Sequence, residues 1–163
     1  MSGWGEEEGW ADSEWEASPA PPAPTAEDAS APDEKPAGDD VRLYYGSVDE
    51  FVREYLRLAY RRPINGRSRV WAAEWWRYDE AVIRLEALWR SWEELRQDAS
   101  TGMSVWWRDH ADHHMAMLMD PDGAFAAADA NADANKTRKG DPLPYSAPPE
   151  GLFPDVRSAV DDA

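Results

Sequence analysis

The chain has 163 residues, enough for one domain with a hydrophobic core, and a formal net charge of −16. It contains no cysteine, which excludes disulfide bonds, thiolate metal sites and a cysteine nucleophile. No run approaches the ~18 apolar residues of a membrane-spanning helix, and the first ten residues lack the basic and apolar regions of a signal peptide. We therefore expect a cytoplasmic protein that does not bind a membrane.

Residues 1–40 form an acidic segment with twelve acids and one base, for a charge of −11. Proline, alanine and acidic residues dominate it. It cannot bury enough apolar surface to offset the entropy lost on ordering, so we predict a disordered tail. Trp4, Trp10 and Trp15 lie among its acids, which is typical of a docking segment that orders on a partner. A solvated tail with incidental tryptophans is the alternative, and we favour it.

The first predicted helix begins at Ser47 and ends before Pro63. Ser47 and Glu50 match the S-x-x-E capping box, and apolar residues recur at helical spacing after them. Pro63 ends the helix because the residue before a proline avoids the helical region. The run INGRSR that follows predicts a turn.

The second predicted helix, residues 79–98, carries the longest regular apolar pattern in the chain. Asp79 is placed to cap its first turn, and Glu80–Arg84 and Glu86–Arg90 are acid-before-base pairs one turn apart. The preceding residues, 71–78, are expected to form a separate short helix or turn. The apolar stripe consists of Ala81, Leu85, Leu88, Trp92 and Leu95, with Trp89 beside it.

The third predicted helix begins at Ser104, as its cap, and ends at the Pro121-Asp122-Gly123 turn. Phe125 is expected to be the last core residue, because the composition from residue 126 onward predicts disorder. A contact of Leu152-Phe153 with the core is the alternative. The fold class is thus all-α: a small Trp-rich helical domain of three main helices and a short helical segment. The predicted parts are a disordered tail at 1–40, the domain at 41–125 and a disordered tail at 126–163.

The helical region carries a series of short tryptophan-rich motifs. They are Trp75-Trp76, Glu80-Ala81, Arg84-Leu85, Ala87-Leu88-Trp89, Trp92-Glu93, Gly102-Met103-Ser104-Val105-Trp106-Trp107-Arg108-Asp109-His110-Ala111-Asp112 and His114-Met115. At these motifs, over about residues 43–125, the chain resembles an actinobacterial family known only as a domain of unknown function. That family is found in Streptomyces-type chromosomes, plasmids and phages. The resemblance implies an actinobacterial or mobile-element setting and no particular activity. The family pattern has a histidine at Tyr78 and a proline at His113.

A histidine- and aspartate-rich run in the third helix is the strongest candidate for metal binding. His110 and His114 are four residues apart, the helical spacing that lets two imidazoles share a metal, and Asp109 lies beside them. Such a site needs a further ligand from elsewhere, and Tyr78 in place of a family histidine argues against one. The alternative, which we favour, is that His114 is a satisfied core histidine and Asp109 pairs with His113.

The sequence contains no glycine-rich phosphate loop and no nucleophile elbow. We therefore predict no catalytic residues, no enzyme activity and no cofactor. We also expect the purified protein to carry no stoichiometric zinc.

A basic region spans residues 53–77, with seven arginines against two glutamates. Within it Arg53, Arg57 and Arg61 recur every four residues and are expected to form a row on the first helix. Beside Trp75 and Trp76, such a row would contact phosphates and offer aromatics for stacking, with the acidic tail as a tethered competitor. The alternative, which we favour, is a solvated helix face whose arginine stems cover apolar surface.

The tryptophans of the helical region are most simply core residues, and any that remain exposed would form an interface. The leading prediction is therefore a non-enzymatic interaction or accessory protein, with a protein partner or a second copy of the chain favoured as its partner. A nucleic-acid binder that uses the arginine row and a His/Asp metal-binding domain are the alternatives.

Overall fold

The computed structural model describes residues 42–157, and in this range the chain forms helices and turns without a strand. The predicted all-α class is confirmed. The tail at residues 1–40, with Trp4, Trp10 and Trp15, lies outside the described residues. Three helical rods form the domain. The first rod consists of α1 (Val48–Phe51), a π-helical stretch (Val52–Leu56) and α2 (Arg57–Ala59), and the second is α3 (Asp79–Leu95). The third rod consists of α4 (Gly102–Val105), a π-helical stretch (Trp106–Ala111) and α5 (Asp112–Met119).

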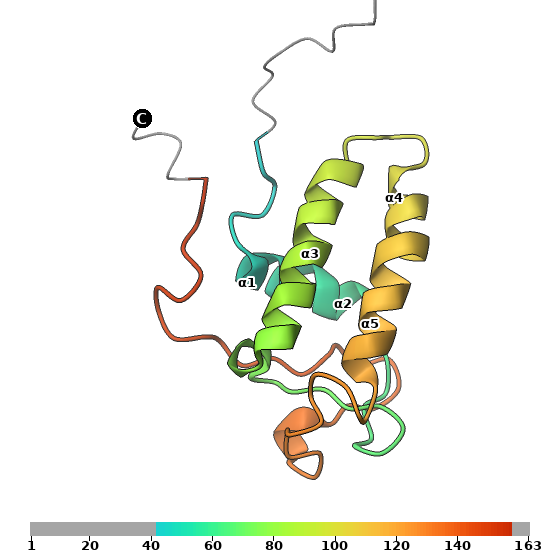
Figure 1. The fold of residues 1–163 in the computed structure, drawn as a ribbon, viewed down its shortest axis with the longest axis vertical. Coiled ribbons are helices and arrows are strands. Elements are labelled where there is room, and N and C mark those ends of the chain that lie inside the picture. The colour runs from blue at the N-terminus through green and yellow to red at the C-terminus, as the bar shows by residue number, and fades with distance from the viewer. Residues whose placement is uncertain (1–41, 158–163) are drawn as a thin grey trace, which may run out of the picture. The chain divides into compact units, whose positions relative to one another are not determined.

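The second and third rods lie side by side and run in opposite directions, joined by a short connection at one end (Figure 1). The first rod crosses them, and α1 contacts α3. Two short 3₁₀ turns, Trp75–Arg77 and Asp133–Asn135, lie outside the rods, and the first confirms the predicted short segment before α3. Within residues 42–157 every helix is too short or too polar to cross a lipid bilayer.

The apolar stripe of α3 lies in the core, as its spacing predicts. Ala81, Leu85 and Leu88 are fully buried, Trp92 is nearly so, and Leu95 is partly buried. Trp92 packs its ring 5.9 Å from that of Phe51 in the first rod. The indole N–H of Trp106, in the third rod, donates to the carbonyl oxygen of Leu88 at 3.0 Å. The stripe therefore joins all three rods.

Two of the three predicted helix starts need correction. The Ser47 hydroxyl caps α1 as predicted, because it accepts from the Glu50 N–H at 3.1 Å. Asp79 is the first residue of α3, and no side chain of the described residues caps the start of that helix. The third rod begins at Gly102, so Ser104 lies inside its first turn and caps nothing. The carboxylate of Asp98 forms the turn there instead, by accepting from Ser100 and Thr101.

The boundary predicted at residue 126 is too early, because residues 126–157 pack onto the helices. Leu143 is fully buried, and its N–H donates to the Arg57 carbonyl oxygen at 3.1 Å. The indole N–H groups of Trp71 and Trp76 donate to the carbonyl oxygens of Pro144 and Ser146. Few apolar side chains hold this segment, but backbone bonds to the helical domain fix its course. The amino-acid composition of residues 126–157 does not indicate these backbone bonds.

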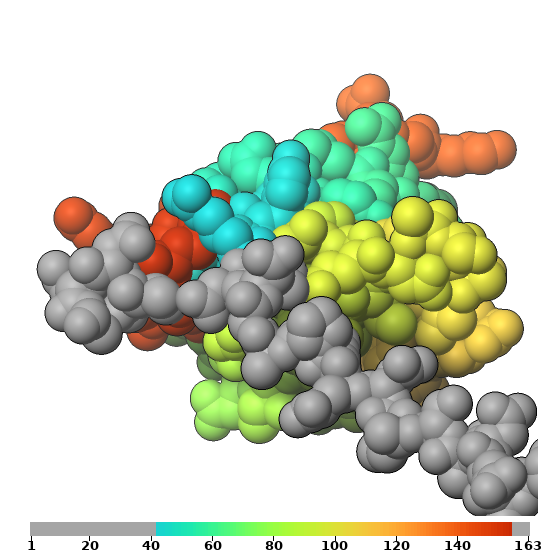
Figure 2. Space-filling model, turned by 90° about the horizontal axis from the view of Figure 1, so that it is seen from above, coloured from blue at the N-terminus to red at the C-terminus, as the bar shows by residue number. Residues whose placement is uncertain are grey.

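The last described residues lie against the first ones, as Figure 2 shows in red and cyan. The N–H of Val156 donates to the Gly46 carbonyl oxygen at 2.9 Å. Arg157 donates to the Tyr44 carbonyl oxygen and to the Glu50 carboxylate. The segment that follows α5 therefore returns to the beginning of α1.

Candidate functional site

The arginine row predicted on the first helix is engaged within the domain. Arg53 pairs with the carboxylates of Asp49 and Glu54. Arg57 donates to the Leu143 carbonyl oxygen at 3.1 Å, and its guanidinium lies 5.5 Å from the centre of the Tyr145 ring. Arg61 donates to the carbonyl oxygens of Leu58 and Gly140. The three side chains thus have separate partners, and the segment after residue 126 covers the middle one.

The tryptophans expected beside that row are not exposed. Trp75 is fully buried and stacks on Phe153 with 5.3 Å between ring centres. Trp76 is half-buried, and its N–H is bound to Ser146. The proposed combination of an arginine row with exposed tryptophans is therefore not assembled. The tryptophans of residues 42–157 are all buried or half-buried: Trp71, Trp75, Trp76, Trp89, Trp92, Trp106 and Trp107.

The histidine- and aspartate-rich run is arranged differently from either hypothesis. Asp109 pairs with its neighbour Arg108, not with His113, and this hydrogen bond lowers the pKa of the Asp109 carboxyl. His110 and His114 are both half-buried, and the Nδ1 atom of His114 is buried without a hydrogen-bond partner among residues 42–157. His114 is therefore not a fully satisfied core histidine.

No third metal ligand joins these histidines within the described part of the chain. There, no group of three or more histidine, aspartate or glutamate side chains is placed to hold a metal ion. Glu80, an acid at the start of α3, pairs with Arg84 at 2.8 Å. His110 lies in a π-helical stretch, which has more residues per turn than an α-helix. His114, four residues later, therefore does not lie directly over His110 on the same face of the helix.

A different basic surface lies on two loops, residues 61–69 and 136–140, which we call the basic loop pair. The two loops contain no acid and carry seven cations: Arg61, Arg62, Arg67, Arg69, Lys136, Arg138 and Lys139. Both loops lie towards the end of the domain where α3 begins and α5 ends, the lower end in Figure 1. The sequence shows the first loop as part of a basic region. The second loop falls in the stretch predicted to be disordered.

Hydrogen bonds from Thr137 join the two loops. Its N–H donates to the Ile64 carbonyl oxygen at 3.2 Å, and its hydroxyl oxygen accepts from the Ile64 N–H at 3.0 Å. The same hydroxyl donates to the Arg62 carbonyl oxygen at 3.0 Å. Arg61 adds the bond to Gly140 already described. The cations of the two loops are therefore held on one connected surface.

The first loop is shaped by an asparagine and a glycine. The Asn65 side-chain oxygen accepts from the backbone N–H groups of Arg67, Ser68 and Arg69. Gly66 has a φ of 72°, in the left-handed region that glycine adopts without a steric penalty. A side chain at Gly66 would also collide with the Ala130 carbonyl oxygen. These local bonds fix the backbone from which Arg67 and Arg69 project.

Ion pairs are common among the arginines outside the basic loop pair, where six of nine form one. None of its seven cations has a carboxylate within salt-bridge distance among residues 42–157. The ion pairs in that range belong to six other arginines: Arg53, Arg77, Arg84, Arg96, Arg108 and Arg157. Six other arginines of the domain thus form ion pairs, and the cations of these two loops form none within the described residues.

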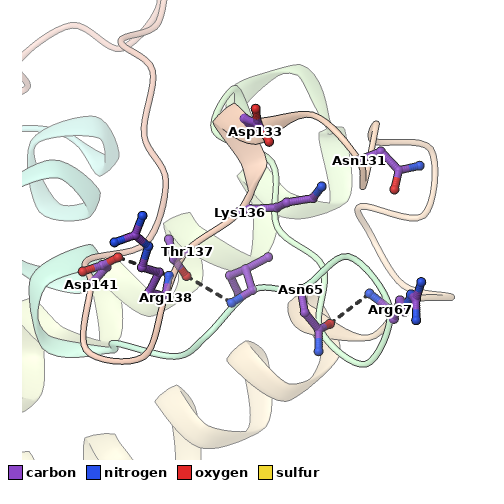
Figure 3. A pocket seen from close by; sticks show the side chains of 9 residues that line it. Asn65, Arg67, Asn131, Asp133, Lys136, Thr137, Arg138 and Asp141 are labelled. Atoms are coloured by element: carbon purple, nitrogen blue, oxygen red, sulfur yellow. Dashed lines mark hydrogen bonds between the residues drawn. The ribbon is translucent and has the colours of Figure 1, made fainter.

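An open cavity of about 810 Å³ lies between the two loops. Figure 3 shows Lys136 extending into the space between Asn131 and the loop that carries Asn65 and Arg67. Arg138 also lines the cavity. Two carboxylates, of Asp133 and Asp141, do so as well, and that of Asp141 accepts from the Arg138 backbone N–H. The lining therefore has three cations against two acids and is rich in hydrogen-bonding groups.

Comparison with known proteins supports the resemblance to a family of unknown function. Residues 45–149 match the model of a family described as "Domain of unknown function (DUF4913)". Neither a curated protein nor a solved structure gives a significant match to the chain. The match covers more than half of the chain and spans the three helical rods and most of the segment after α5. The chain therefore belongs to the DUF4913 family of domains of unknown function.

Proposed function

We propose that this protein is a non-enzymatic accessory protein that binds nucleic acid through the basic loop pair. The observation that carries this proposal is a set of seven cations on two loops joined by hydrogen bonds, none of which has a carboxylate partner among residues 42–157. Arg61 and Arg62 donate to backbone carbonyl oxygens, but a bond to a neutral carbonyl leaves the positive charge, which can attract an external anion. Several such charges along one surface favour a polyanion over a single small anion.

The kind of cation favours phosphate as the anion. Five of the seven side chains are arginines, whose planar guanidinium groups form paired hydrogen bonds with phosphate oxygens. Asn131 lines the cavity between the loops, and asparagine amides commonly contact the sugar-phosphate backbone. Contacts of this type fix a protein on the backbone without reading the base sequence.

Two other partners fit this surface less well. Insertion into a membrane surface requires exposed apolar side chains, and neither loop has an exposed large apolar residue. The protein partner or homodimer favoured by the tryptophan content would require exposed tryptophans, whereas those of the described part serve the core. Binding to an acidic protein partner is the third possibility, and competition by an acidic polypeptide tests it.

The cellular setting is part of the same proposal. The resemblance implies an actinobacterium or its plasmids and phages, and a cytoplasmic location would place the protein with nucleic acid. The non-enzymatic part of the proposal rests on the sequence, which has no recognised catalytic motif. Genes for conjugation or phage functions beside this one would support an accessory role.

A charge-matched comparison tests the nucleic-acid proposal. We expect the full chain to bind a fluorescent oligonucleotide at low salt, measured by fluorescence anisotropy. Replacing Arg67, Lys136 and Arg138 with glutamine should weaken binding at least tenfold. It should also reduce the slope of log K against log salt by about 2–3, since each lost phosphate contact removes about 0.9.

The matched control removes three exposed arginines outside the basic loop pair: Arg77, Arg90 and Arg108. It changes the net charge equally and should weaken binding much less. Equal weakening by both triple variants would show that overall charge, not this site, governs binding. Absence of binding by the unchanged chain at low salt would overturn the proposal. Competition by an acidic polypeptide at equal charge concentration would point to a protein partner instead.

A further inference from the structure

A second cavity, of about 310 Å³, borders the first loop of the basic loop pair. The loop lies against the end of α5, where the Val70 N–H donates to the Met119 carbonyl oxygen at 3.0 Å. Apolar groups from α5 and two arginines from the loop therefore meet in one lining. The residues that line it are Tyr60, Arg62, Ser68, Arg69, Met115, Ala116, Met119, Asp120 and Pro121.

Arg62 is held beside this cavity in a stacked arrangement. Its guanidinium lies over the Tyr60 ring, 4.4 Å from the ring centre, and also donates to the Arg61 carbonyl oxygen. Tyr60 lies nearly parallel to Trp107, with 5.9 Å between ring centres and 12° between ring planes. A cation held over an aromatic face is fixed by electrostatic attraction to the ring. The planar guanidinium is therefore ordered before any ligand arrives.

We infer that this cavity receives an unstacked base of a single-stranded nucleic acid whose phosphates lie on the basic loop pair. This inference rests on the proposed function and adds the class of nucleic acid. Protein side chains hold unstacked bases by stacking on aromatic rings or on arginine guanidinium planes. Here Arg62 provides the plane.

The remaining lining suits a flat ring of variable shape. Met115 and Met119 are buried core residues that form the apolar floor of the cavity. Arg69 adds a second cation, while the one carboxylate, of Asp120, accepts from the Asp122 backbone N–H at 2.8 Å. These groups contact a base without a fixed set of donors and acceptors. We therefore expect little preference among base sequences.

The two cavities share one loop, and this connection selects single strands. Arg67 lines the larger cavity, and Arg69, two residues later, lines the smaller one. A strand whose phosphates contact Arg67 can therefore place a neighbouring base beside Arg69 and Arg62. The bases of a duplex are stacked and paired inside the helix, so a base must be unpaired and unstacked, at a cost in free energy, before it makes the same contact. A single strand has no pairing to break.

The test compares a single-stranded oligonucleotide with a duplex of the same sequence, using the full chain and fluorescence anisotropy. We expect Arg62→Lys, which keeps the charge but removes the planar group, to weaken single-strand binding at least fivefold. Its duplex affinity should stay within about twofold of the unchanged chain, since phosphate contacts depend mainly on charge. Ala116→Leu, which fills the cavity from an exposed position on α5, should have the same selective effect.

Arg67→Lys is the matched control, because it makes the same chemical change in the same loop without a stacked partner. It should alter single-strand and duplex affinities by the same factor. Thermal unfolding of each variant checks that the fold is retained. If Arg62→Lys and Ala116→Leu also change both affinities equally, the base-binding inference is wrong while the proposed function stands. If the unchanged chain binds neither nucleic acid, both are wrong.

Discussion

His114 shows how burial changes the chemistry of one residue. The imidazole is half-buried on α5, and burial is the main cause that lowers its pKa. The nearby charges of Arg84, His113 and His110 lower the pKa further. A proton on this ring would lose hydration and meet other cations, so the folded chain disfavours protonated His114. The unfolded chain accepts that proton near the ordinary histidine pKa of 6.5.

This difference predicts how stability depends on pH. Below about pH 6.5 the unfolded chain binds more protons at this residue than the folded chain, so acidification destabilises the fold. The stability that neutral His114 contributes is fully present above pH 6.5, and it is lost as the pH falls towards the lowered pKa of the folded state. We expect His114→Gln to lose less stability between about pH 7.5 and pH 5.5 than the unchanged chain. Urea unfolding at both pH values measures the difference.

The control for this prediction is His113→Gln, which replaces an exposed neighbour. That variant should keep most of the loss of stability on acidification, because the buried imidazole is still present. An equal loss in the unchanged chain and in His114→Gln would show that other groups cause the acid sensitivity.

At the scale of elements, helical periodicity succeeded where the helix is regular. α3 is an uninterrupted α-helix, and its predicted stripe of Leu85, Leu88 and Trp92 is buried. The first and third rods each contain a π-helical stretch, in which the hydrogen bonds span one more residue. Residues four apart are then rotated away from one another. A regular helical wheel therefore cannot place the arginine row or the His110–His114 pair.

The segment after α5 shows a second limit of sequence reasoning. Its few apolar residues are separated by prolines and polar residues, so no periodic pattern indicates packing. The contacts that order it join residues far apart in the chain, such as Leu143 to Arg57 and Tyr145 to Asp49. The hydroxyl of Tyr145 donates to the Asp49 carboxylate at 2.7 Å. Burial is the main cause that raises the pKa of Tyr145 to about 12, and the hydrogen bond to Asp49 is the next largest cause. Such pairings follow from the fold and not from composition.

Leu143 provides a test of this packing. Its side chain is fully buried, so Leu143→Ala should lower the free energy of unfolding by about 2–5 kcal/mol, the range for emptying a buried leucine site. Leu152→Ala is the matched control from the same segment, because Leu152 is 47% exposed. It should change stability by no more than about 0.5 kcal/mol. Urea unfolding measures both, and a loss below that limit in Leu143→Ala would place the segment off the core.

At the scale of the whole molecule, net charge and local charge have opposite signs. The chain carries −16, and residues 1–40 account for −11 of it. The basic loop pair nevertheless carries seven cations and no acid. Four of them belong to the basic region that the sequence shows at residues 53–77. The other three come from the segment predicted to be disordered, and only the fold brings them together. Of the residues that the sequence predicts for nucleic-acid binding, only Arg61 belongs to the basic loop pair.

The acidic residues at 1–40 should weaken nucleic-acid binding by the rest of the chain. Deleting them changes the net charge from −16 to −5, which reduces the repulsion between the protein and phosphates. We expect the deletion to raise affinity for a single-stranded oligonucleotide several-fold at low salt. The gain should shrink at high salt, because exposed charges more than about 10 Å apart are largely screened at 0.1 M. Anisotropy titrations of both proteins at two salt concentrations measure this effect.

A control separates the charge of these residues from their aromatic side chains. Replacing Trp4, Trp10 and Trp15 with alanine keeps all twelve acids and should leave the affinity of the full chain unchanged. If the tryptophan variant gains as much as the deletion, the aromatic residues cause the inhibition and the docking interpretation is preferred. If neither protein differs from the unchanged chain at low salt, the acidic residues do not oppose binding. In that case the net charge of the chain does not determine the electrostatic potential at the basic loop pair.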